Sequence, residues 1–469
     1  MRSRNLILLA LVVAGLGAFI YFQERHLPTT GERRAKADTL FPDLERDQVE
    51  SLDIHNTHGA FRIVKQGDSW HLVEPIEFPA DETAVSSLLG SLENLKAERT
   101  LTESEVDPKA YGLDRPSIAL TLTTGDGSTS SLEIGDQAAL GSNRAVRRNG
   151  ESSVILVSGW FVRDLDRALD EWRSRDLAEI PADDVASLVV LAGADRIELV
   201  RQGETWRLLQ PLEDVADRDH VRNLISDLDA LRVEEFLDDP PPAAELGLDV
   251  PAYQVTILRS SGGDPLRLDF GSSRERDGRT QVACRRNASE HFWVDDRAAT
   301  RLAKAPVRWR STKVAAFDTW NAERLTITAG GSSVTLERKE GMWVAPQGGA
   351  VEYGAVQDRL AALAALEAVD FDLVEPATPP TGTVELELKA VGDDAKSQQL
   401  SFSFHRPLVE GGQALVRVSG RATVMSVNAA TVEQILADPM ALVKTAAESE
   451  SDTGVEAVGS GDQPLDAGP

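Results

Sequence analysis

The chain has 469 residues, of which 42% are hydrophobic and 27% charged, a composition typical of a globular protein with about three domains. Its formal net charge of −27 argues against a nucleic-acid partner, because a phosphate backbone is bound by a surface rich in Lys and Arg. Cys284 is the single cysteine, which excludes a disulfide within the chain and a thiolate metal site.

The N-terminus carries an apolar run, Leu6 to Phe22, of 17 uncharged residues behind Arg2 and Arg4. At about 1.5 Å per residue, a helix of this length just reaches across a bilayer. We therefore expect residues 1–5 in the cytoplasm and a single transmembrane anchor over residues 6–22 of the cytoplasmic (inner) membrane. The C-terminal domains would lie in the periplasm or outside the cell. A cleaved signal peptide is the alternative. Residues 23–40 are polar and predict a linker.

Residues 41–176 begin with apolar and polar residues in alternation, from Leu52 to Leu72, with glycines between the runs. This pattern predicts a three-stranded antiparallel meander. The next apolar residues have helical spacing: Val85, Leu88, Leu89, Leu92 and Leu95. One face of this helix should cover the sheet. A second meander follows, and a helix from Val162 to Leu169 is expected at its end.

A tryptophan that follows a glycine turn recurs at a nearly constant interval. Trp70, Trp206 and Trp343 are 136 and then 137 residues apart, and the apolar pattern around them recurs as well. So long a period predicts copies of a domain-sized segment.

The predicted fold is therefore α+β with three tandem repeats, at residues 41–176, 177–313 and 314–444. Each repeat would be an antiparallel β-meander plus helix followed by a second β-meander and helix, after one N-terminal transmembrane helix. Residues 445–469 contain six acidic residues and no basic ones, which predicts a disordered acidic tail.

The recurring tryptophans are interpreted as folding residues, because a large aromatic side chain on the inner side of a strand buries much apolar area. Trp172 and Trp309 also recur at matching places, 137 residues apart. A ligand-binding aromatic box is the alternative. Equivalent residues in every copy favour a requirement of the fold, since a single active site would reside in one copy.

Three histidines, His55, His58 and His71, form the candidate metal site, for zinc or copper. The interpretation as ordinary surface histidines is favoured, because His55 and His58 are three residues apart and would point to opposite faces of a strand. We predict no metal site, no cofactor-binding residue and no cofactor.

Two further sequence patterns can be explained without a functional site. Asp214, Asp217 and Asp219 form an acidic loop of the kind that binds calcium, yet their spacing does not fit an EF-hand and they are expected to precede a helix. Asn287-Ala288-Ser289 matches a glycosylation sequon by pattern only. The sequence has no phosphate-binding glycine loop, nucleophile elbow, HExxH or CxxC motif, so no catalytic residue is predicted and the protein is expected not to be an enzyme.

The order of these motifs resembles that of the bacterial family called domain of unknown function 4340, over roughly residues 40 to 440. The motifs that carry the resemblance are Leu40-Phe41-Pro42, Gly67-x-x-Trp70-x-Leu72-x-x-Pro75 and Gly112-Leu113-Asp114-x-Pro116. The resemblance implies a membrane-anchored protein of the cell envelope, of a kind sometimes associated with ABC-type transporters of gliding motility. It implies no catalytic or binding residues.

The preferred hypothesis is a non-enzymatic envelope scaffold or accessory subunit of an ABC-type transport or motility complex, with transporter membrane subunits as its protein partners. The first alternative is a periplasmic protein that binds polysaccharide or peptide in a groove between the repeats, and the second is an unrecognised hydrolase.

Overall fold

The computed structural model describes residues 39–102, 107–138, 141–303, 306–374, 377–389, 397–405 and 412–444. The chain splits into two compact units, residues 1–177 and 178–469. The predicted N-terminal segment and anchor (1–22), almost all of the linker (23–40) and the tail (445–469) lie outside the described residues. Among the helices of the described segments, none has the length and hydrophobicity that a membrane span needs.

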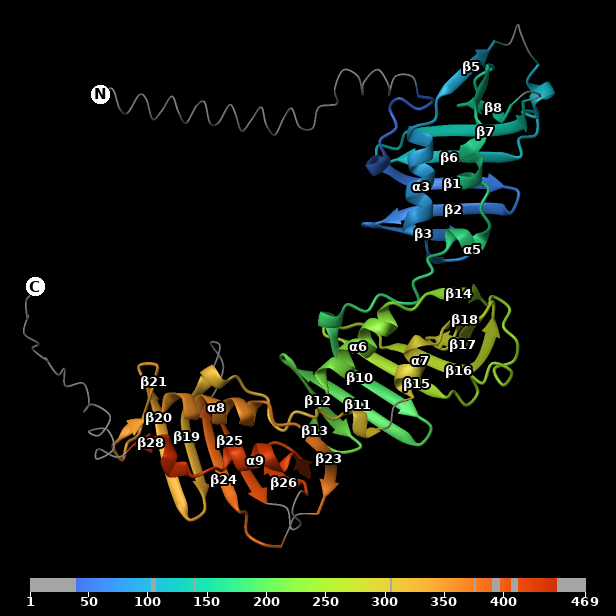
Figure 1. Cartoon of the computed structure of the whole chain (residues 1–469). Helices are drawn as coiled ribbons and strands as arrows, with labels where there is room; N and C mark the ends of the chain where they lie inside the picture. The colour runs from blue at the N-terminus through green and yellow to red at the C-terminus, as the bar shows by residue number, and fades with distance from the viewer. Residues whose placement is uncertain are drawn as a thin grey trace, which may run out of the picture. The chain divides into compact units, whose positions relative to one another are not determined.

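The first unit contains one antiparallel sheet of nine strands, sheet 1, in the order β4-β3-β2-β1-β6-β7-β8-β9-β5 (Figure 1). Strand β1 pairs with β2 on one side and with β6 on the other, so it joins the two halves of the sheet. The strands are β1 Val49–Asn56, β2 Gly59–Gln66, β3 Ser69–Glu74, β4 Phe78–Pro79, β5 Ala97–Leu101, β6 Ile118–Thr124, β7 Thr129–Gln137, β8 Asn143–Arg148 and β9 Val154–Ser158.

Helix α3, Glu82–Glu93, crosses one face of sheet 1 (Figure 1). The helix begins where the Asp81 side chain accepts a hydrogen bond from the Ala84 N–H, which satisfies one of the free donors of the first turn. Val85, Leu88 and Leu92 are fully buried, as their helical spacing predicted. The remaining helical segments of the unit are short: η1 Arg46–Gln48, η2 Pro108–Tyr111, η3 Gly159–Phe161, α4 Val162–Leu165 and α5 Leu169–Trp172.

The second unit contains two large antiparallel sheets. Sheet 2 has nine strands in the order β13-β12-β11-β10-β15-β16-β17-β18-β14, with helix α6 (Arg218–Asp229) against it (Figure 1). Its strands are β10 Val185–Ala192, β11 Asp195–Gln202, β12 Thr205–Gln210, β13 Asp214–Val215, β14 Val233–Phe236, β15 Tyr253–Arg259, β16 Leu266–Arg276, β17 Arg279–Arg286 and β18 Glu290–Asp295. The other helical segments are η4 Ala182–Asp184, α7 Arg297–Leu302 and η5 Pro306–Trp309.

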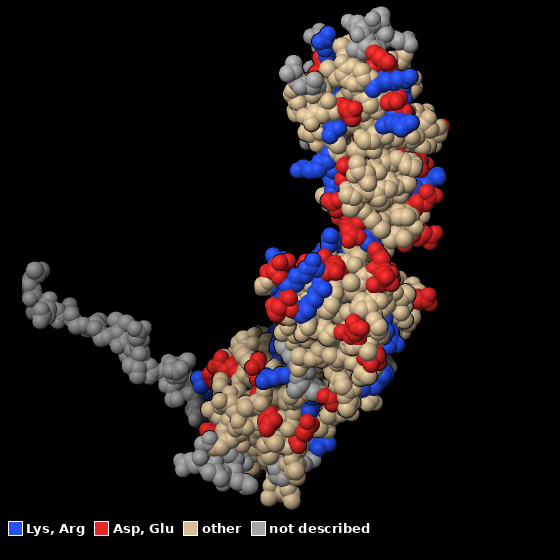
Figure 2. Space-filling view, turned by 90° about the vertical axis from the view of Figure 1, so that its right-hand side faces the viewer, with Lys and Arg blue, Asp and Glu red and all other residues tan. Residues whose placement is uncertain are grey.

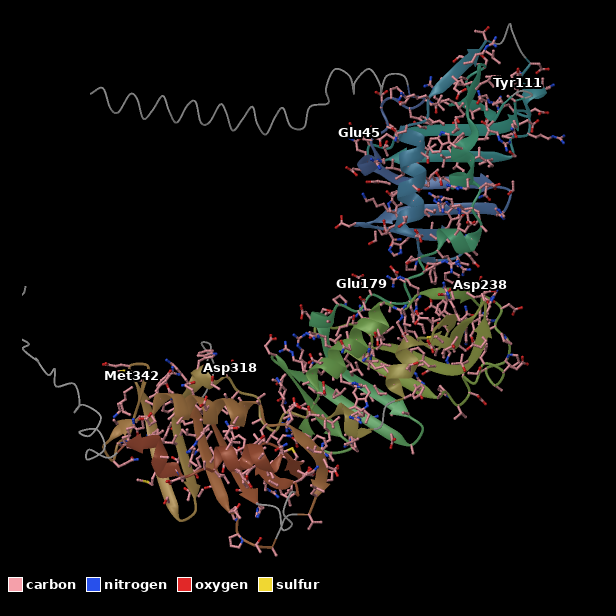
Figure 3. All side chains as sticks on the ribbon, viewed as in Figure 1. Glu45, Tyr111, Glu179, Asp238, Asp318 and Met342 are labelled. Carbon is pink, nitrogen blue, oxygen red and sulfur yellow. The ribbon has the colours of Figure 1, made fainter. Side chains whose placement is uncertain are left out.

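Sheet 3 has eight strands in the order β21-β20-β19-β24-β25-β26-β27-β23, and a separate two-stranded sheet pairs β22 with β28. The strands are β19 Ala322–Ala329, β20 Ser332–Lys339, β21 Met342–Val344, β22 Ala350–Val351, β23 Ala368–Leu373, β24 Gly382–Leu388, β25 Gln398–His405, β26 Ala414–Val418, β27 Val424–Val427 and β28 Val443–Lys444. The helical segments are η6 Thr319–Asn321, α8 Tyr353–Ala364, α9 Ala429–Ile435 and η7 Pro439–Leu442. Met342 on the edge strand β21 is 65% exposed (Figure 3).

The predicted fold class is wrong. Strands account for 47% of the structure and helices for only 21%, so the described chain is dominated by antiparallel sheet rather than by helix-backed meanders in tandem. The two predicted meanders of residues 41–176 form one sheet, because β1 pairs with β6 and thereby removes an edge that each meander would otherwise leave unpaired. The expected helix from Val162 to Leu169 is replaced by the four-residue helices α4 and α5.

Charges of both signs are interspersed on the face of the molecule seen in Figure 2. Opposite charges also pair within sheet 3, where the Arg324 guanidinium lies 3.1 Å from the Glu337 carboxylate and 3.3 Å from that of Glu387. The acidic excess of the sequence is therefore not gathered into one acidic patch on this face.

Candidate functional site

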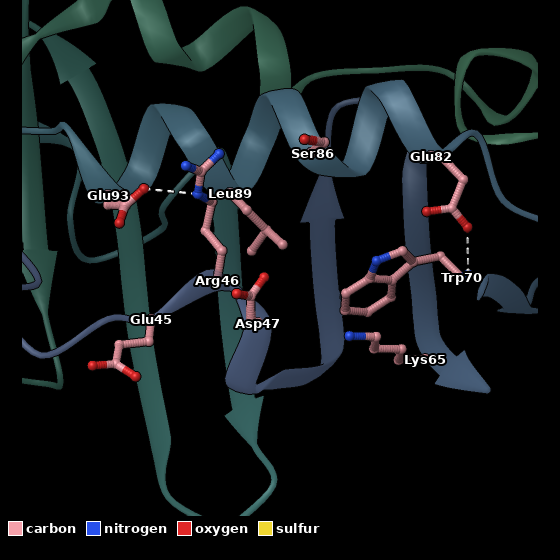
Figure 4. A pocket seen from close by; sticks show the side chains of 9 residues that line it. All are labelled: Glu45, Arg46, Asp47, Lys65, Trp70, Glu82, Ser86, Leu89 and Glu93. Carbon is pink, nitrogen blue, oxygen red and sulfur yellow. Dashed lines mark hydrogen bonds and ion pairs between the residues drawn. The ribbon is translucent and has the colours of Figure 1, made fainter. Parts of the chain in front are cut away.

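A polar groove of about 550 Å³ lies in the first unit, between η1, helix α3 and the β2–β3 hairpin (Figure 4). Its lining combines carboxylates, two cations, one indole and one hydroxyl group: Glu45, Arg46, Asp47, Lys65, Trp70, Glu82, Ser86, Leu89 and Glu93. Glu45 stands at the η1 end of the groove, at the margin of the sheet (Figures 3 and 4). A concave surface with few apolar and many polar groups suits a polar ligand.

The hairpin and the helix together set the geometry of this groove. Gly67, with φ of 65°, takes the left-handed conformation that the tight turn between β2 and β3 requires. The turn aligns Lys65 opposite Trp70 in the strand register, so both side chains project from the same face. The Glu82 carboxylate of α3 accepts a hydrogen bond of 2.7 Å from the Trp70 N–H of the backbone, which fixes the helix to the hairpin.

Figure 4 shows the Trp70 indole reaching across the groove toward Arg46 and Asp47, with Lys65 beside the ring. Arg46 forms an ion pair of 2.7 Å with Glu93 of α3, which connects η1 to the helix at the η1 end of the groove. Trp70 is only 7% exposed, so the ring packs in the core and presents its edge to the groove.

The three candidate histidines do not converge. His55 lies on β1 and His71 on β3, with β2 between them, and the exposed His58 lies in the β1–β2 turn. The described residues contain no group of three or more His, Cys, Asp or Glu side chains that could hold a metal ion.

The three loop aspartates have separate structural roles. Asp217 is the N-cap of α6 and accepts a hydrogen bond from the His220 N–H, and Asp219 pairs with Arg222 on the surface. The sequence interpretation as the acidic start of a helix is therefore confirmed for these two. Asp214 is different: its side chain is completely buried.

Two arginines hold Asp214 in the Asp214 cluster (Asp214, Arg310 and Arg421), which the sequence pattern did not predict. The Arg310 Nε donates to one carboxylate oxygen at 2.7 Å, and the Arg421 Nε donates to the other at 2.5 Å. Both arginine side chains are only 3% exposed. Asp214 belongs to the edge strand of sheet 2, and Arg421 to the β26–β27 hairpin of sheet 3, so the cluster joins the two sheets of the second unit.

The terminal nitrogens of the two arginines also have partners. Arg310 donates to Asp372 (2.7 Å) and Thr423 (2.6 Å) of sheet 3. Arg421 donates to two backbone carbonyls of the connecting segment, those of Ser311 (2.9 Å) and Lys313 (2.6 Å). Each guanidinium nitrogen thus has a partner, and such pairing is what a buried charge needs to be tolerated. The only sequence signal for the cluster was an arginine after each of the recurring residues Trp172 and Trp309.

The predicted folding role of the tryptophans is confirmed by their burial. Trp70, Trp206 and Trp343 are 5–7% exposed, and Trp172 and Trp309 at most 1%. The alternative of an open aromatic box does not fit such burial.

The sequon residue Asn287 lies in the exposed β17–β18 turn, where its side-chain oxygen accepts a hydrogen bond of 3.0 Å from the Arg267 N–H.

Comparison with protein families gives one match. The family model described as "Domain of unknown function (DUF4340)" matches residues 70–251 and residues 206–389, two overlapping regions that together span more than half of the chain. Each match begins at one of the recurring tryptophans, Trp70 or Trp206. No curated protein matches the chain.

Among solved structures, similar chains include two sliding-clamp structures from Pseudomonas aeruginosa. The DNA polymerase III subunit beta is 8% identical, with 85% of this chain and 95% of that chain covered and a TM-score of 0.16. The DNA polymerase sliding clamp with ligand is 9% identical, with the same coverage and a TM-score of 0.13. Similarity this weak supports no conclusion about fold or function.

Proposed function

Because this chain belongs to the DUF4340 family, whose function is unknown, we propose from its own residues that it is a non-enzymatic scaffold of the cell envelope. The scaffold would be held at the cytoplasmic membrane by the apolar run Leu6 to Phe22, with its sheets on the outer side. It would serve as an accessory subunit of an ABC-type transport or motility complex.

The observation that supports a scaffold is the Asp214 cluster. Removal of one member of a buried ion pair leaves an uncompensated charge and typically costs about 3–5 kcal/mol. Sheets 2 and 3 are thus joined by a contact that resists separation, although each has its own hydrophobic core. A preorganised surface loses little conformational entropy on binding, which favours association with a partner protein.

The test is purification of the full chain from membranes, followed by crosslinking and mass spectrometry. We expect crosslinks between sheet 2 or sheet 3 and the membrane subunits of an ABC-type transporter. A variant without residues 6–22 should leave the membrane fraction and lose these crosslinks, because the anchor supplies the high local concentration near the partner.

A variant with Arg421→Ala tests the role of the Asp214 cluster separately. It should keep its membrane association and lose most of the transporter crosslinks. Crosslinks that persist in this variant would show that the junction between the sheets is irrelevant to partner binding. Full-length protein that gives no transporter crosslink at all would refute the accessory role.

A further inference from the structure

The cation opposite the recurring tryptophan differs between the first sheet and the other two. In all three sheets a basic residue faces the tryptophan across the hairpin, and the pairs are Lys65 with Trp70, Arg201 with Trp206 and Arg338 with Trp343. The same backbone register thus holds a lysine in sheet 1 and an arginine in sheets 2 and 3.

In sheets 2 and 3 this arginine is tied to the 3-10 turn that precedes the first strand. Arg201 donates to the carbonyl oxygens of Ala182 (3.3 Å) and Asp183 (2.9 Å), and Arg338 donates to that of Trp320 (2.7 Å). Each of these bonds connects the hairpin to the 3-10 turn, and the equivalent two elements of sheet 1 border the groove. Lys65 has no hydrogen-bond or ion-pair partner among the residues that the structure describes, so its ammonium group remains available in the groove.

Two more donors line the groove without a partner in the described part of the chain. One is the indole N–H of Trp70, on a side chain that is 93% buried (7% exposed), and Figure 4 places its nitrogen on the ring edge that faces helix α3. The other is the hydroxyl group of Ser86 on α3. The corresponding fifth residue of α6 is Arg222, whose larger side chain pairs with Asp219.

Hydrogen-bond acceptors line the same groove as these donors. Within the described segments the Asp47 carboxylate has no partner, and the Glu45 carboxylate accepts a hydrogen bond of 2.5 Å from the side chain of Gln48. An anionic ligand would be repelled by these carboxylates. A cationic ligand would meet the unpaired charge of Lys65, whereas the charge of Arg46 is offset by its ion pair with Glu93. A neutral hydroxyl group satisfies both kinds of neighbour, because it donates to a carboxylate and accepts from an ammonium or indole N–H.

We propose that this groove of the first unit binds a neutral saccharide, with Lys65, Trp70 and Ser86 as hydrogen-bond donors and Asp47 and Glu45 as acceptors. The volume of about 550 Å³ is that of a small-molecule site. This site lies on a single sheet, not between repeats, and it would add ligand recognition to the proposed scaffold role.

The experiment is isothermal titration of the full chain with chitohexaose and maltohexaose, and in parallel with oligogalacturonate and hexalysine as anionic and cationic probes. We expect one of the two neutral oligosaccharides to bind. Failure of both neutral probes to bind, or preferential binding of hexalysine or oligogalacturonate, would overturn the proposal.

Two variants test whether the saccharide binds in this groove. Lys65→Arg should restore the tether seen in sheets 2 and 3 and weaken saccharide binding about tenfold, the effect of losing roughly one hydrogen bond to a charged group. Ser86→Arg should block the groove with a larger side chain. Lys109→Arg, on η2 outside the groove, is the matched control and should bind like the unaltered protein. Unchanged affinity in both groove variants, with unchanged unfolding midpoints, would place the saccharide elsewhere and refute the site.

Discussion

Asp214 shows how much one residue contributes to this protein. Its carboxylate is fully buried and accepts hydrogen bonds from two guanidinium groups, whereas Asp219, five residues later, is 75% exposed in its pair with Arg222. A buried charge is tolerated only while its partners are present, and an exposed pair contributes little because water screens it.

The substitution Asp214→Asn should therefore lower the free energy of unfolding of the second unit by about 3 kcal/mol, because Arg421 loses its carboxylate partner and Arg310 keeps only that of the half-exposed Asp372. Urea denaturation followed by tryptophan fluorescence measures the change. The matched control Asp219→Asn should change the free energy of unfolding by no more than about 0.5 kcal/mol. Equal effects of the two substitutions would show that the buried cluster has no special role in stability.

Cys284 is a second residue whose surroundings determine its chemistry. Burial of the thiol raises its pKa well above the usual range, and the nearby Asp269 carboxylate raises it further. Because the thiolate is the reactive form, the folded protein should not react with iodoacetamide at pH 8, while urea-unfolded protein should react fully. Mass spectrometry of the alkylated peptide checks this, and rapid labelling of the native protein would contradict the buried position.

At the scale of the element, helix α3 depends on both its first turn and its buried face. Asp81 caps the N-terminus, and Glu82 connects the first turn to the hairpin through the Trp70 N–H. The helix therefore shapes the groove as well as covering the sheet.

Replacement of the cap by Asp81→Ala should lower the stability of the first unit by about 1 kcal/mol, because the Ala84 N–H loses its acceptor. Thr83→Ala, at an exposed position of the same turn, should leave stability unchanged or slightly raised, since alanine favours the helix. Thermal unfolding of both variants measures the difference. A smaller loss for Asp81→Ala than for Thr83→Ala would argue against the cap.

At the scale of the whole molecule, the division into residues 1–177 and 178–469 places sheets 2 and 3 in one compact unit. The contact between these sheets requires residues more than 200 positions apart, Asp214 and Arg421. The second unit should consequently lose stability when sheet 3 is removed, even though sheet 2 has a core of its own.

A fragment of residues 178–444 should fold and unfold cooperatively in urea. A shorter fragment of residues 178–313 should have a lower unfolding midpoint, because it keeps Asp214 and Arg310 but loses Arg421 and the surface that buries them. Circular dichroism during denaturation compares the two. Equal midpoints would mean that sheet 3 does not stabilise sheet 2.

The sequence by itself determined the local features of this protein. Glycine turns, the alternation from Leu52 to Leu72, the spacing of Val85, Leu88 and Leu92 and the burial of the tryptophans all follow from the conformational preferences and hydrophobicity of near neighbours. The resemblance to the DUF4340 family rested on the same local motifs, and the family match confirms it.

Only the tertiary structure decided which of these pieces share a sheet and where charges are buried. The pairing of β1 with β6 joined two predicted meanders, and the sequence distance between the strands left that choice open. Asp214 looked like its neighbours Asp217 and Asp219 in sequence, but Arg421 reaches it from another sheet. The groove likewise depends on whether the cation opposite the tryptophan is tethered. The sequence contains lysine at 65 and arginine at 201 and 338, but only the structure shows the bonds that the two arginines make to the preceding 3-10 turn.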